Sequence, residues 1–387
     1  MVTLLPVTGH VVAPDHAADV VAPPYDLLTE PERAELADAS PDSFLRVLPS
    51  GVSDDSGLAA NRRAFDRLLA TGRFHALDRP SLGVLCLDHD AGRTVALLGD
   101  IDVAAFLDGR VLPHERIDAD RVGHLVRHLE VVGIASSPVC VVHRPDAEVT
   151  AATRMATSDA PLFSFVAPDG VRLSLHLVDE PVLLHRLADA VHAAGTLFVA
   201  DGHHRAAAIA KHARAGGAPR VFTAVVPSDQ LRVLAFHRRI DGLRDATAST
   251  VLAALEADDL WPEPAHDPGA PGEPGIAHLT VDGRWWVVDL RDRRGTGPVE
   301  ALDVRAAERH LLEPLGRLGA DDSGIRVIPV PAPQGLDALV RDGSVGIALH
   351  PPTIDDVLAV AEAGEVMPPK STYLAPKLRS GLVVVPR

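Results

Sequence analysis

The stretch Thr196-Leu-Phe-Val-Ala-Asp-Gly-His-His-Arg-Ala-Ala-Ala-Ile-Ala210 carries the strongest structural signal in the sequence. Its apolar first half predicts a buried strand that ends at Ala200, and its alanine-rich second half predicts a helix that begins near His203 or His204. Asp201 and Gly202 make the turn between them, where glycine permits a close approach of the backbone. A strand that runs straight into a helix in this way points the positive helix end, with its backbone N–H groups, at the turn.

We interpret this turn as a site for an anion, most simply a phosphate group. Gly202 would let the phosphate approach the backbone, and the imidazoles of His203 and His204 and the guanidinium of Arg205 would donate hydrogen bonds to its oxygens. Asp201 would bind a metal ion or orient a histidine. The alternative is a capping aspartate followed by solvent-facing histidines on the first turn of a helix.

A second segment with chemical potential is Val111-Leu-Pro-His-Glu-Arg-Ile-Asp-Ala-Asp-Arg121. It follows an expected strand and precedes an expected amphipathic helix, which places His114, Glu115 and Arg116 on a loop or a first helical turn. A carboxylate beside an imidazole is a candidate general base toward a hydroxyl group. The alternative is a polar helix entry with ordinary surface charges.

Two further segments contain residue types that are rare in this chain. The segment Val366-Met-Pro-Pro-Lys-Ser-Thr-Tyr-Leu-Ala-Pro-Lys377 holds Lys370 and Lys377, two of the three lysines in a chain that has 37 basic residues. Their ammonium groups could supply point charges to a phosphate; the alternative is a polar connector into a final strand. The segment Val21-Ala-Pro-Pro-Tyr-Asp26 presents one of only two tyrosines on an extended backbone. A rigid turn without a function is the alternative there.

Composition excludes several classes of protein. The 387 residues are 47% hydrophobic and 23% charged, which is typical of a globular protein. A formal charge of −16 disfavours nucleic acid as a partner. No apolar run is long enough to span a membrane and no secretory signal is recognisable, so we expect a cytoplasmic protein. The two cysteines, Cys86 and Cys140, lie in apolar runs and are predicted to be reduced core residues.

Apolar runs of strand length alternate with helical patterns along the chain, and this alternation predicts an α+β fold of mixed sheets with flanking helices. Expected strands are 81–87, 94–103, 139–143, 171–178, 196–200, 221–226, 285–290, 325–330, 345–350 and 382–385. Expected helices are 30–39, 58–70, 121–131, 181–194, 204–215, 246–256, 304–315 and 354–363, and Thr353 is expected to cap the last of them. We predict a main domain over residues 1–262, a Pro/Gly-rich loop or linker over 263–275, and a smaller α/β unit over 276–387 whose end, 366–387, returns to the site of the main domain.

The motifs Pro23-Pro-Tyr-Asp, Pro113-His-Glu-Arg, Ala200-Asp-Gly-His-His-Arg and Met367-Pro-Pro-Lys-Ser-Thr, with Pro376-Lys and Ser380-Gly-Leu, occur in an order and spacing that resemble the domain of unknown function 1015 family. The resemblance covers nearly the whole chain. The Asp-Gly-His-His-Arg turn is also similar to the phosphate-binding turn of the ParB and sulfiredoxin superfamily, which includes free-serine kinases. That similarity implies a ParB/sulfiredoxin-like phosphate-binding core.

The resemblance to the free-serine kinases implies a function and a role for each motif. It implies a phosphotransferase, most simply a kinase, that phosphorylates free L-serine or a similar hydroxylated metabolite in serine metabolism, with Mg²⁺ and with ATP, ADP or pyrophosphate as donor. The chain departs from the family at Ala206-Ala-Ala-Ile, where Tyr-Glu-Thr-Ala is usual, and at Ile117, where threonine is common. The implied catalytic residues are Glu115 (the base), Asp201 (also the metal ligand) and His204; the implied phosphate ligands are Gly202, His203, Arg205, Lys370 and Lys377; the implied substrate contacts are Tyr25, Asp26, His114, Arg116, Ser371 and Thr372.

Two other functions remain open at this point. A nucleotide- or phosphate-binding regulatory protein would keep the phosphate turn without turnover, and the alanine at position 207, where the family has a carboxylate, favours that reading. A nuclease or DNA-clamp relative is disfavoured by the acidic charge. We expect a small-molecule substrate as partner, no nucleic acid, no membrane, and a homodimer as one possible state.

Overall fold

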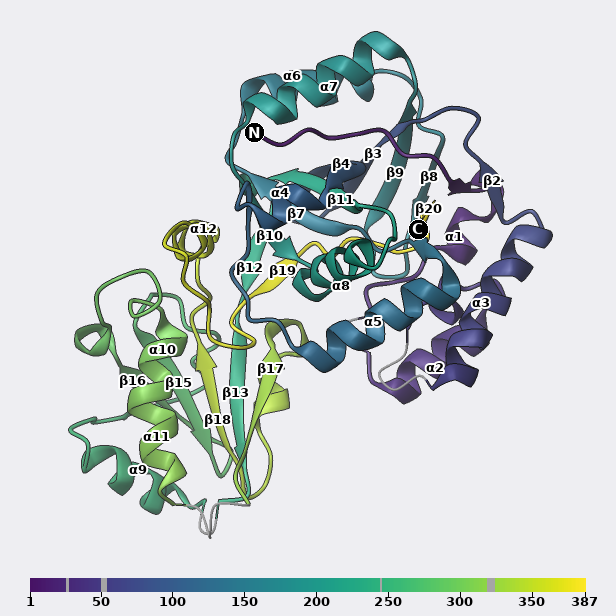
Figure 1. The fold of residues 1–387 in the computed structure, drawn as a ribbon. Helices are drawn as coiled ribbons and strands as arrows, with labels where there is room; N and C mark the ends of the chain where they lie inside the picture. The colour runs from purple at the N-terminus through teal and green to yellow at the C-terminus, as the bar shows by residue number, and fades with distance from the viewer. Residues whose placement is uncertain (26–27, 50–53, 244–245, 319–323) are drawn as a thin grey trace. The chain divides into compact units, whose positions relative to one another are not determined.

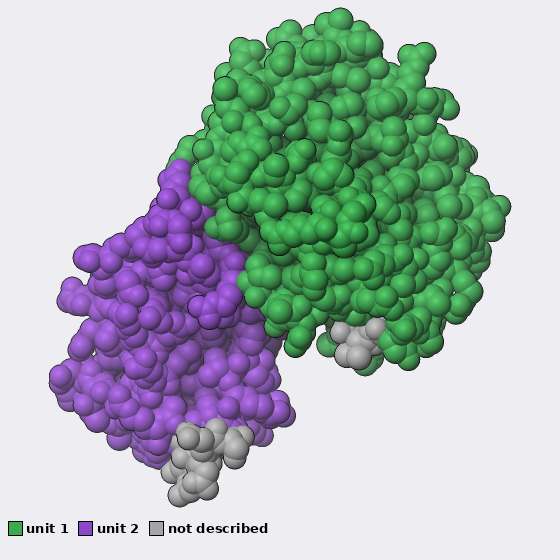
Figure 2. Space-filling view, in the orientation of Figure 1, with its two compact units in different colours: residues 1–113, 117–231, 376–387 green, residues 114–116, 232–375 purple. Residues whose placement is uncertain are grey.

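The computed structural model describes residues 1–25, 28–49, 54–243, 246–318 and 324–387. Within them the chain forms two compact units (Figure 2). Unit 1 comprises residues 1–113, 117–231 and 376–387, and unit 2 comprises residues 114–116 and 232–375. Both units combine sheets with helices (Figure 1), which confirms the predicted α+β class. The central sheet of unit 1 is mixed, as predicted, whereas the six-stranded sheet of unit 2 is antiparallel.

An eight-stranded mixed sheet forms the centre of unit 1. Its strands, in spatial order, are β5 (Val111–Leu112), β10 (Leu197–Asp201), β7 (Val139–His143), β11 (Arg220–Pro227), β4 (Gly92–Asp102), β3 (Leu82–His89), β9 (Arg172–Val178) and β8 (Phe163–Val166). The pairs β10–β5 and β11–β7 are parallel, and the other pairs in the sheet are antiparallel.

A second, four-stranded sheet in unit 1 joins segments from the beginning, the middle and the end of the sequence. Its order is β2 (Phe74–Ala76), β1 (His10–Val12), β20 (Val383–Pro386) and β6 (Ile134–Ala135). Strand β20 is antiparallel to both neighbours, with Val384 opposite His10 and Val385 opposite Ala135. This pairing anchors residues 376–387 in unit 1.

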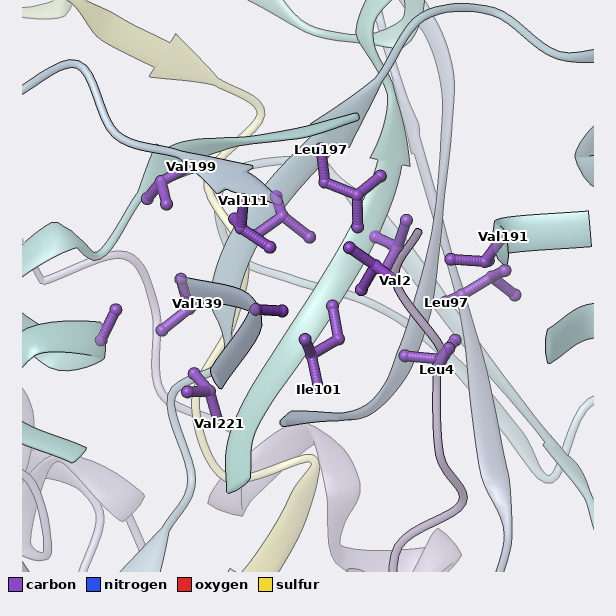
Figure 3. Packing of buried hydrophobic residues seen from close by; sticks show 14 of the residues in the cluster. Val2, Leu4, Leu97, Ile101, Val111, Val139, Val191, Leu197, Val199 and Val221 are labelled. Atoms are coloured by element: carbon purple, nitrogen blue, oxygen red, sulfur yellow. The ribbon is translucent and has the colours of Figure 1, made fainter. Parts of the chain in front are cut away.

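Some helices of unit 1 pack apolar residues into one large core, and others lie outside it. In chain order the helices are α1 (Ala17–Val20), α2 (Glu30–Ala39), α3 (Asp55–Ala70), α4 (Val103–Leu107), α5 (Ala119–Val132), α6 (Ala147–Ala156), α7 (Pro181–Ala193) and α8 (His203–Arg214). Helices α4 to α8 contribute buried side chains to the same cluster as the central strands. Figure 3 shows this packing around Leu97, Val139, Val199 and Val221. Burial of apolar surface stabilises a fold by about 25 cal/mol per Å². Because this core is extensive, it holds β10 and the start of α8 in fixed positions.

Unit 2 is built on a six-stranded sheet with helices beside it. The strand order is β14 (Glu263–Ala265), β16 (Arg284–Asp289), β15 (Ile276–Val281), β18 (Val345–Leu349), β13 (Phe236–Asp241) and β17 (Arg326–Pro331), and a separate pair joins β12 (Arg232–Leu234) to β19 (Tyr373–Ala375). The helices are α9 (Ala248–Glu256), α10 (Asp303–Ala307), α11 (Glu313–Gly316) and α12 (Ile354–Glu362), and one π-helical turn, Glu308–Leu312, connects α10 to α11.

The division of the chain differs from the predicted one. The boundary falls at Arg232 instead of residue 262, since β13 and α9 pack with unit 2. The Pro/Gly-rich residues 266–275 form a loop that connects β14 to β15 inside unit 2, and the carbonyl of Gly269 lies 2.9 Å from His278 Nδ1. At the other end, residues 366–375 belong to unit 2, whereas residues 376–387 belong to unit 1 because of the β20 pairing.

Several local predictions are confirmed. Thr353 caps α12 by accepting a hydrogen bond from the Asp356 amide, and the Asp356 carboxylate accepts one from the Thr353 amide in return. Cys86 and Cys140 are buried and free. Burial raises the pKa of Cys140 to about 12, which fits a reduced core thiol.

Candidate functional site

The predicted strand–turn–helix is present at residues 197–214, and charged side chains cluster at its turn. Strand β10 ends at Asp201, and α8 begins at His203. Gly202 lies between them in the left-handed region, with φ +95° and ψ +26°, a conformation that favours glycine. A Cβ atom at this position would lie 2.8 Å from Arg205 Nη2, so a glycine is also needed to let Arg205 fold back over the turn.

Asp201 binds two cations in unit 1. Its Oδ1 atom accepts a hydrogen bond from Lys377 Nζ at 2.8 Å, and its Oδ2 atom accepts one from Arg205 Nη2 at 2.7 Å. Burial alone would raise the pKa of Asp201, but the positive charges of Lys377 and Arg205 outweigh burial and hold the pKa of this carboxyl well below its usual range. Asp201 is therefore ionised at neutral pH and fixes the position of both cations.

The C-terminal segment reaches this cluster through the second sheet of unit 1. Residues 376–382 run from Lys377 into β20, and three backbone hydrogen bonds hold them: Ala22 N–H to Ser380 O at 3.0 Å, Gly381 N–H to Ser136 O at 3.2 Å, and Val12 N–H to Leu382 O at 3.0 Å. The Lys377 side chain is 12% exposed. The ammonium is thus placed beside Asp201 by backbone pairing and not by a flexible tail.

A pocket opens beside the two cations. It is lined by Tyr25, Ser137, Asp201, Arg205, Lys377 and Arg379, with Pro24, Pro138, Leu378 and Ser380. The hydroxyl oxygens of Ser137 and Ser380 lie 2.6 Å apart, and Arg205 Nη2 donates a further hydrogen bond to Pro138 O at 3.3 Å. With three cations against one carboxylate in its lining, the pocket suits an anion.

A second, largely apolar pocket adjoins the cationic one, because both share Tyr25, Ser137 and Arg205. Its remaining walls come mainly from the loop before α3 and from α5, β6 and α8: Leu48, Pro49, Leu125, His128, Leu129, Ile134, Ala135, Ser136, Ala208 and Ile209. The His128 ring is 2.8 Å from Val47 O, and burial lowers the pKa of His128, so this wall is uncharged at neutral pH. The arrangement offers an apolar surface on one side of Arg205 and positive charge on the other.

The two histidines of the turn differ in their surroundings. His203, the first residue of α8, is 3% exposed. His204 Nε2 accepts a hydrogen bond from the Asp118 amide at 3.1 Å, which requires an unprotonated Nε2. Asp118 caps α5 by accepting from the Arg121 amide, so His204 ties the first turn of α8 to the start of α5.

The other predicted site residues form a group in unit 2. His114, Glu115 and Arg116 lie on the loop between β5 and α5, and the His114 carbonyl accepts a hydrogen bond from the Met367 amide at 2.8 Å. Ser371 is buried and donates its hydroxyl hydrogen to Pro368 O at 2.6 Å. Unit 2 thus brings the Pro-His-Glu-Arg motif to the segment that contains Lys370, Ser371 and Thr372.

The structure groups the predicted residues as follows. Unit 1 unites Tyr25, Asp201, Gly202, Arg205 and Lys377, with His203 and His204 on the same helical turn. Asp26 lies outside the described residues. The sequence predicts no role for Ser137, Arg379 or Ser380, although all three line the pocket. Arg379 and Ser380 are close to Lys377 in the C-terminal motif, and that position was an available signal.

Comparison with known proteins identifies the family. Residues 4–305 match the family described as "Protein of unknown function (DUF1015)", and the chain belongs to this family, as its motifs predicted. A search among curated proteins returned no match.

Solved structures with partial similarity to this chain were found at low identity. They include a free serine kinase mutant in complex with ADP (12% identity, TM-score 0.39, 75% of this chain and 91% of that one) and SbnI with a C-terminal truncation from Staphylococcus aureus (12%, TM-score 0.43, 75% and 87%). A conserved hypothetical protein from Pyrococcus furiosus is similar to the same extent (14%, TM-score 0.37, 75% and 94%). No helix in the described residues is long and apolar enough to cross a membrane.

Proposed function

We propose that this protein is a phosphotransferase that phosphorylates a small hydroxylated metabolite, with free L-serine as the preferred acceptor. The observation that carries the proposal is the placement of Lys377 and Arg205 on Asp201, at the beginning of α8 and at the edge of a cationic pocket. Phosphoryl transfer needs positioning and neutralisation of charge above all. Cations that are held by a fixed carboxylate meet that need without rearranging during the reaction.

The donor's phosphates would lie at the start of α8. The positive end of this helix and the Gly202 backbone face the phosphate oxygens, while Arg205 and Lys377 neutralise the charge that develops on the transferred group. The serine hydroxyl oxygen attacks the terminal phosphorus, the bond from that phosphorus to the bridging oxygen breaks, and the bridging oxygen leaves with the electron pair. Glu115 as the acceptor of the hydroxyl proton stays a prediction from the sequence resemblance.

The apolar pocket favours a nucleotide as donor. A base would contact the Leu125, Leu129 and Ile209 side of the pocket, and Arg205, which lines both pockets, would lie where the base and the phosphates join. Pyrophosphate would use only the cationic pocket. ATP and ADP are therefore preferred over pyrophosphate in this proposal.

A magnesium ion fits the site only together with the phosphates. Asp201 is the one carboxylate among the described residues that line the cationic pocket, and both of its oxygens already accept hydrogen bonds from cations. Mg²⁺ commonly binds proteins through one or two carboxylates plus the phosphates of the substrate. When bound, the ion would supply further neutralisation of phosphate charge, and Asp201 would hold it.

The test is product formation by the full chain with each donor separately. Purified protein is incubated with Mg²⁺, L-serine and ATP, ADP or pyrophosphate, and phosphoserine is followed by ³¹P NMR. Phosphoserine is expected with a nucleotide donor, and it should disappear in Lys377→Met and Glu115→Gln. Lys211→Met is the matched control, because Lys211 is an exposed residue near the other end of α8. No phosphoserine with any donor contradicts the proposal.

One observation favours a second candidate, a phosphate- or nucleotide-binding regulatory protein without turnover. The described lining of the cationic pocket contains no carboxylate that could act as a base, since Asp201 is engaged by Lys377 and Arg205. Nucleotide binding by calorimetry together with absent phosphoserine would support this candidate.

A further inference from the structure

Arg379 is a buried cation whose hydrogen bonding is incomplete. Its side chain is 3% exposed and its Nη2 atom donates to Asp169 Oδ2. The Nε and Nη1 atoms are buried as well, and they have no hydrogen-bond partner among the residues that the structure describes. The ion pair with Asp169 therefore accounts for only part of this guanidinium.

A buried guanidinium with unpaired donors lowers the stability of the folded protein. Buried donors are nearly always paired. A charged donor without an acceptor has lost its hydration, and no hydrogen bond compensates for that desolvation. The side chain of Asp169 is 47% exposed and could pair with an arginine in solvent equally well. The burial of Arg379 thus points to an acceptor that arrives with a ligand.

The surroundings indicate what kind of acceptor this is. Arg379 lines the cationic pocket together with Lys377 and Arg205, and the hydroxyl groups of Ser137 and Ser380 contact each other in the same lining. Asp201, the carboxylate of that pocket, is bound by the other two cations. An oxyanion would accept from Arg379 and from a serine hydroxyl at once.

We propose that Arg379, with Ser137 and Ser380, forms a subsite for an oxyanion group of the ligand, which is either the carboxylate of the acceptor or a phosphate of the donor. The inference rests on the proposed function only for the choice of these two ligands. In this inference Arg379 binds the oxyanion group of the ligand, whereas Lys377 and Arg205 neutralise charge beside the start of α8.

Binding to the full chain is measured by isothermal calorimetry with three probes: inorganic pyrophosphate, L-serine and L-serinamide, which lacks the carboxylate. Arg379→Gln should weaken the binding of either pyrophosphate or L-serine by about tenfold to a hundredfold, as expected for the loss of a hydrogen bond to a charged group. A loss confined to pyrophosphate identifies the donor's phosphate. A loss confined to L-serine, with L-serinamide binding poorly to the native protein, identifies the acceptor's carboxylate.

Asp169→Asn is the matched control, because it breaks the ion pair and leaves Nε and Nη1 in place. It should change either affinity less than threefold. If Asp169→Asn reproduces the loss seen in Arg379→Gln, or if Arg379→Gln binds both anions with native affinity, the arginine is structural and the inference is overturned. Absence of binding of both anions to the native protein overturns it too. Should Arg379→Gln fail to fold, Arg379→Lys keeps the charge without the guanidinium and is expected to show the same loss.

These outcomes separate the inference from the proposed function. Weakened anion binding in Arg379→Gln supports the subsite even if the native protein makes no phosphoserine. Conversely, phosphoserine production that depends on Lys377 while Arg379→Gln keeps native affinities leaves the proposed function standing and removes the subsite.

Discussion

Two consecutive segments, residues 366–375 and 376–387, each contain one lysine, and the two lysines differ in burial and in their partners. Lys377 is largely buried, and its Nζ atom binds Asp201 in unit 1. Lys370 is exposed in unit 2, with its Nζ atom 5.7 Å from the centre of the Phe236 ring. The same residue type in one sequence motif therefore has a role that depends on its partner and its burial, which the motif alone does not reveal.

The cause lies in which part of each lysine the fold holds. The backbone of Lys370 has φ +55°, a conformation unusual for lysine, and its carbonyl accepts a hydrogen bond from Arg238 Nη1 at 3.0 Å. Arg238 also donates to Pro369 O, so unit 2 fixes the main chain of this turn. For Lys377 the side chain is the group that is held.

Removing the partner of Lys377 is expected to have the largest effect. Asp201→Asn leaves Lys377 and Arg205 close together without a counter-charge, and we expect the free energy of unfolding at pH 7 to fall by about 3 kcal/mol. Urea denaturation of both proteins measures the difference. A loss under about 1 kcal/mol would show that solvent screens the cluster as it screens a surface ion pair.

The same variant tests the titration of Asp201. Its pKa is held below the unfolded value of about 3.9, so the stabilisation is fully present above that pH and is lost as the pH falls through the folded pKa. The difference in unfolding free energy between native protein and Asp201→Asn should stay constant from about pH 7 to pH 5 and shrink below about pH 4. A difference that grows on acidification would contradict the assignment.

Removing Lys377 itself is expected to act mainly on ligand binding. Lys377→Met should weaken pyrophosphate binding by about a hundredfold, since one close, partly buried hydrogen-bonded charge is worth about 2–3 kcal/mol. Calorimetry at fixed ionic strength measures it. Lys211→Met, the same chemical change on an exposed residue of α8, should leave the affinity within about twofold.

A substitution at Gly202 separates the contribution of Arg205 from that of the lysines, because it displaces Arg205 and leaves both lysines in place. Gly202→Ala should lower the free energy of unfolding by about 1–2 kcal/mol through its positive φ, and it should also weaken anion binding because the new Cβ meets Arg205. Gly216→Ala is the matched control: its φ is +97°, but a Cβ there meets nothing within 4 Å. It should lower stability alone, and equal anion affinities in both variants would exclude a role for the Arg205 position.

The smallest effect is expected at Lys370. Lys370→Met should change the free energy of unfolding by no more than about 0.5 kcal/mol and pyrophosphate affinity by no more than about twofold, as is usual for an exposed position. Thermal denaturation and calorimetry measure both. An affinity loss as large as that of Lys377→Met would contradict the difference between the two lysines and assign both to one ligand.

The sequence predicted the local parts of the site well. The strand–turn–helix around Asp201 was expected within one or two residues of its observed bounds, because apolar periodicity, Gly202 and the alanine run all agree there. Strand β13 was not predicted, since Phe-His-Arg-Arg-Ile-Asp shows no simple alternation. The buried Arg238 in this strand donates hydrogen bonds to the carbonyls of residues 369 and 370, which lie more than a hundred residues away in the sequence.

Partners distant in the sequence also explain the other gaps. Strands β1 and β6 have three and two residues, and their pairing with β20 cannot be read from so few positions. A role for Arg379 was not predicted, because arginine supplies nearly all of the positive charge of this chain and one more arginine is not distinctive. Its burial depends on Asp169 and on the anchoring of β20, which local patterns do not encode.

The pairing of β20 with β1 and β6 has a consequence for protein synthesis. Lys377 and Arg379 are translated after Tyr25, Ser137, Asp201 and Arg205. Folding that begins on the ribosome can form the central sheet of unit 1 early, but its cationic pocket waits for β20 to be released and to insert between β1 and β6. A nascent chain that stops before Pro376 would therefore lack two of the three cations that line the pocket.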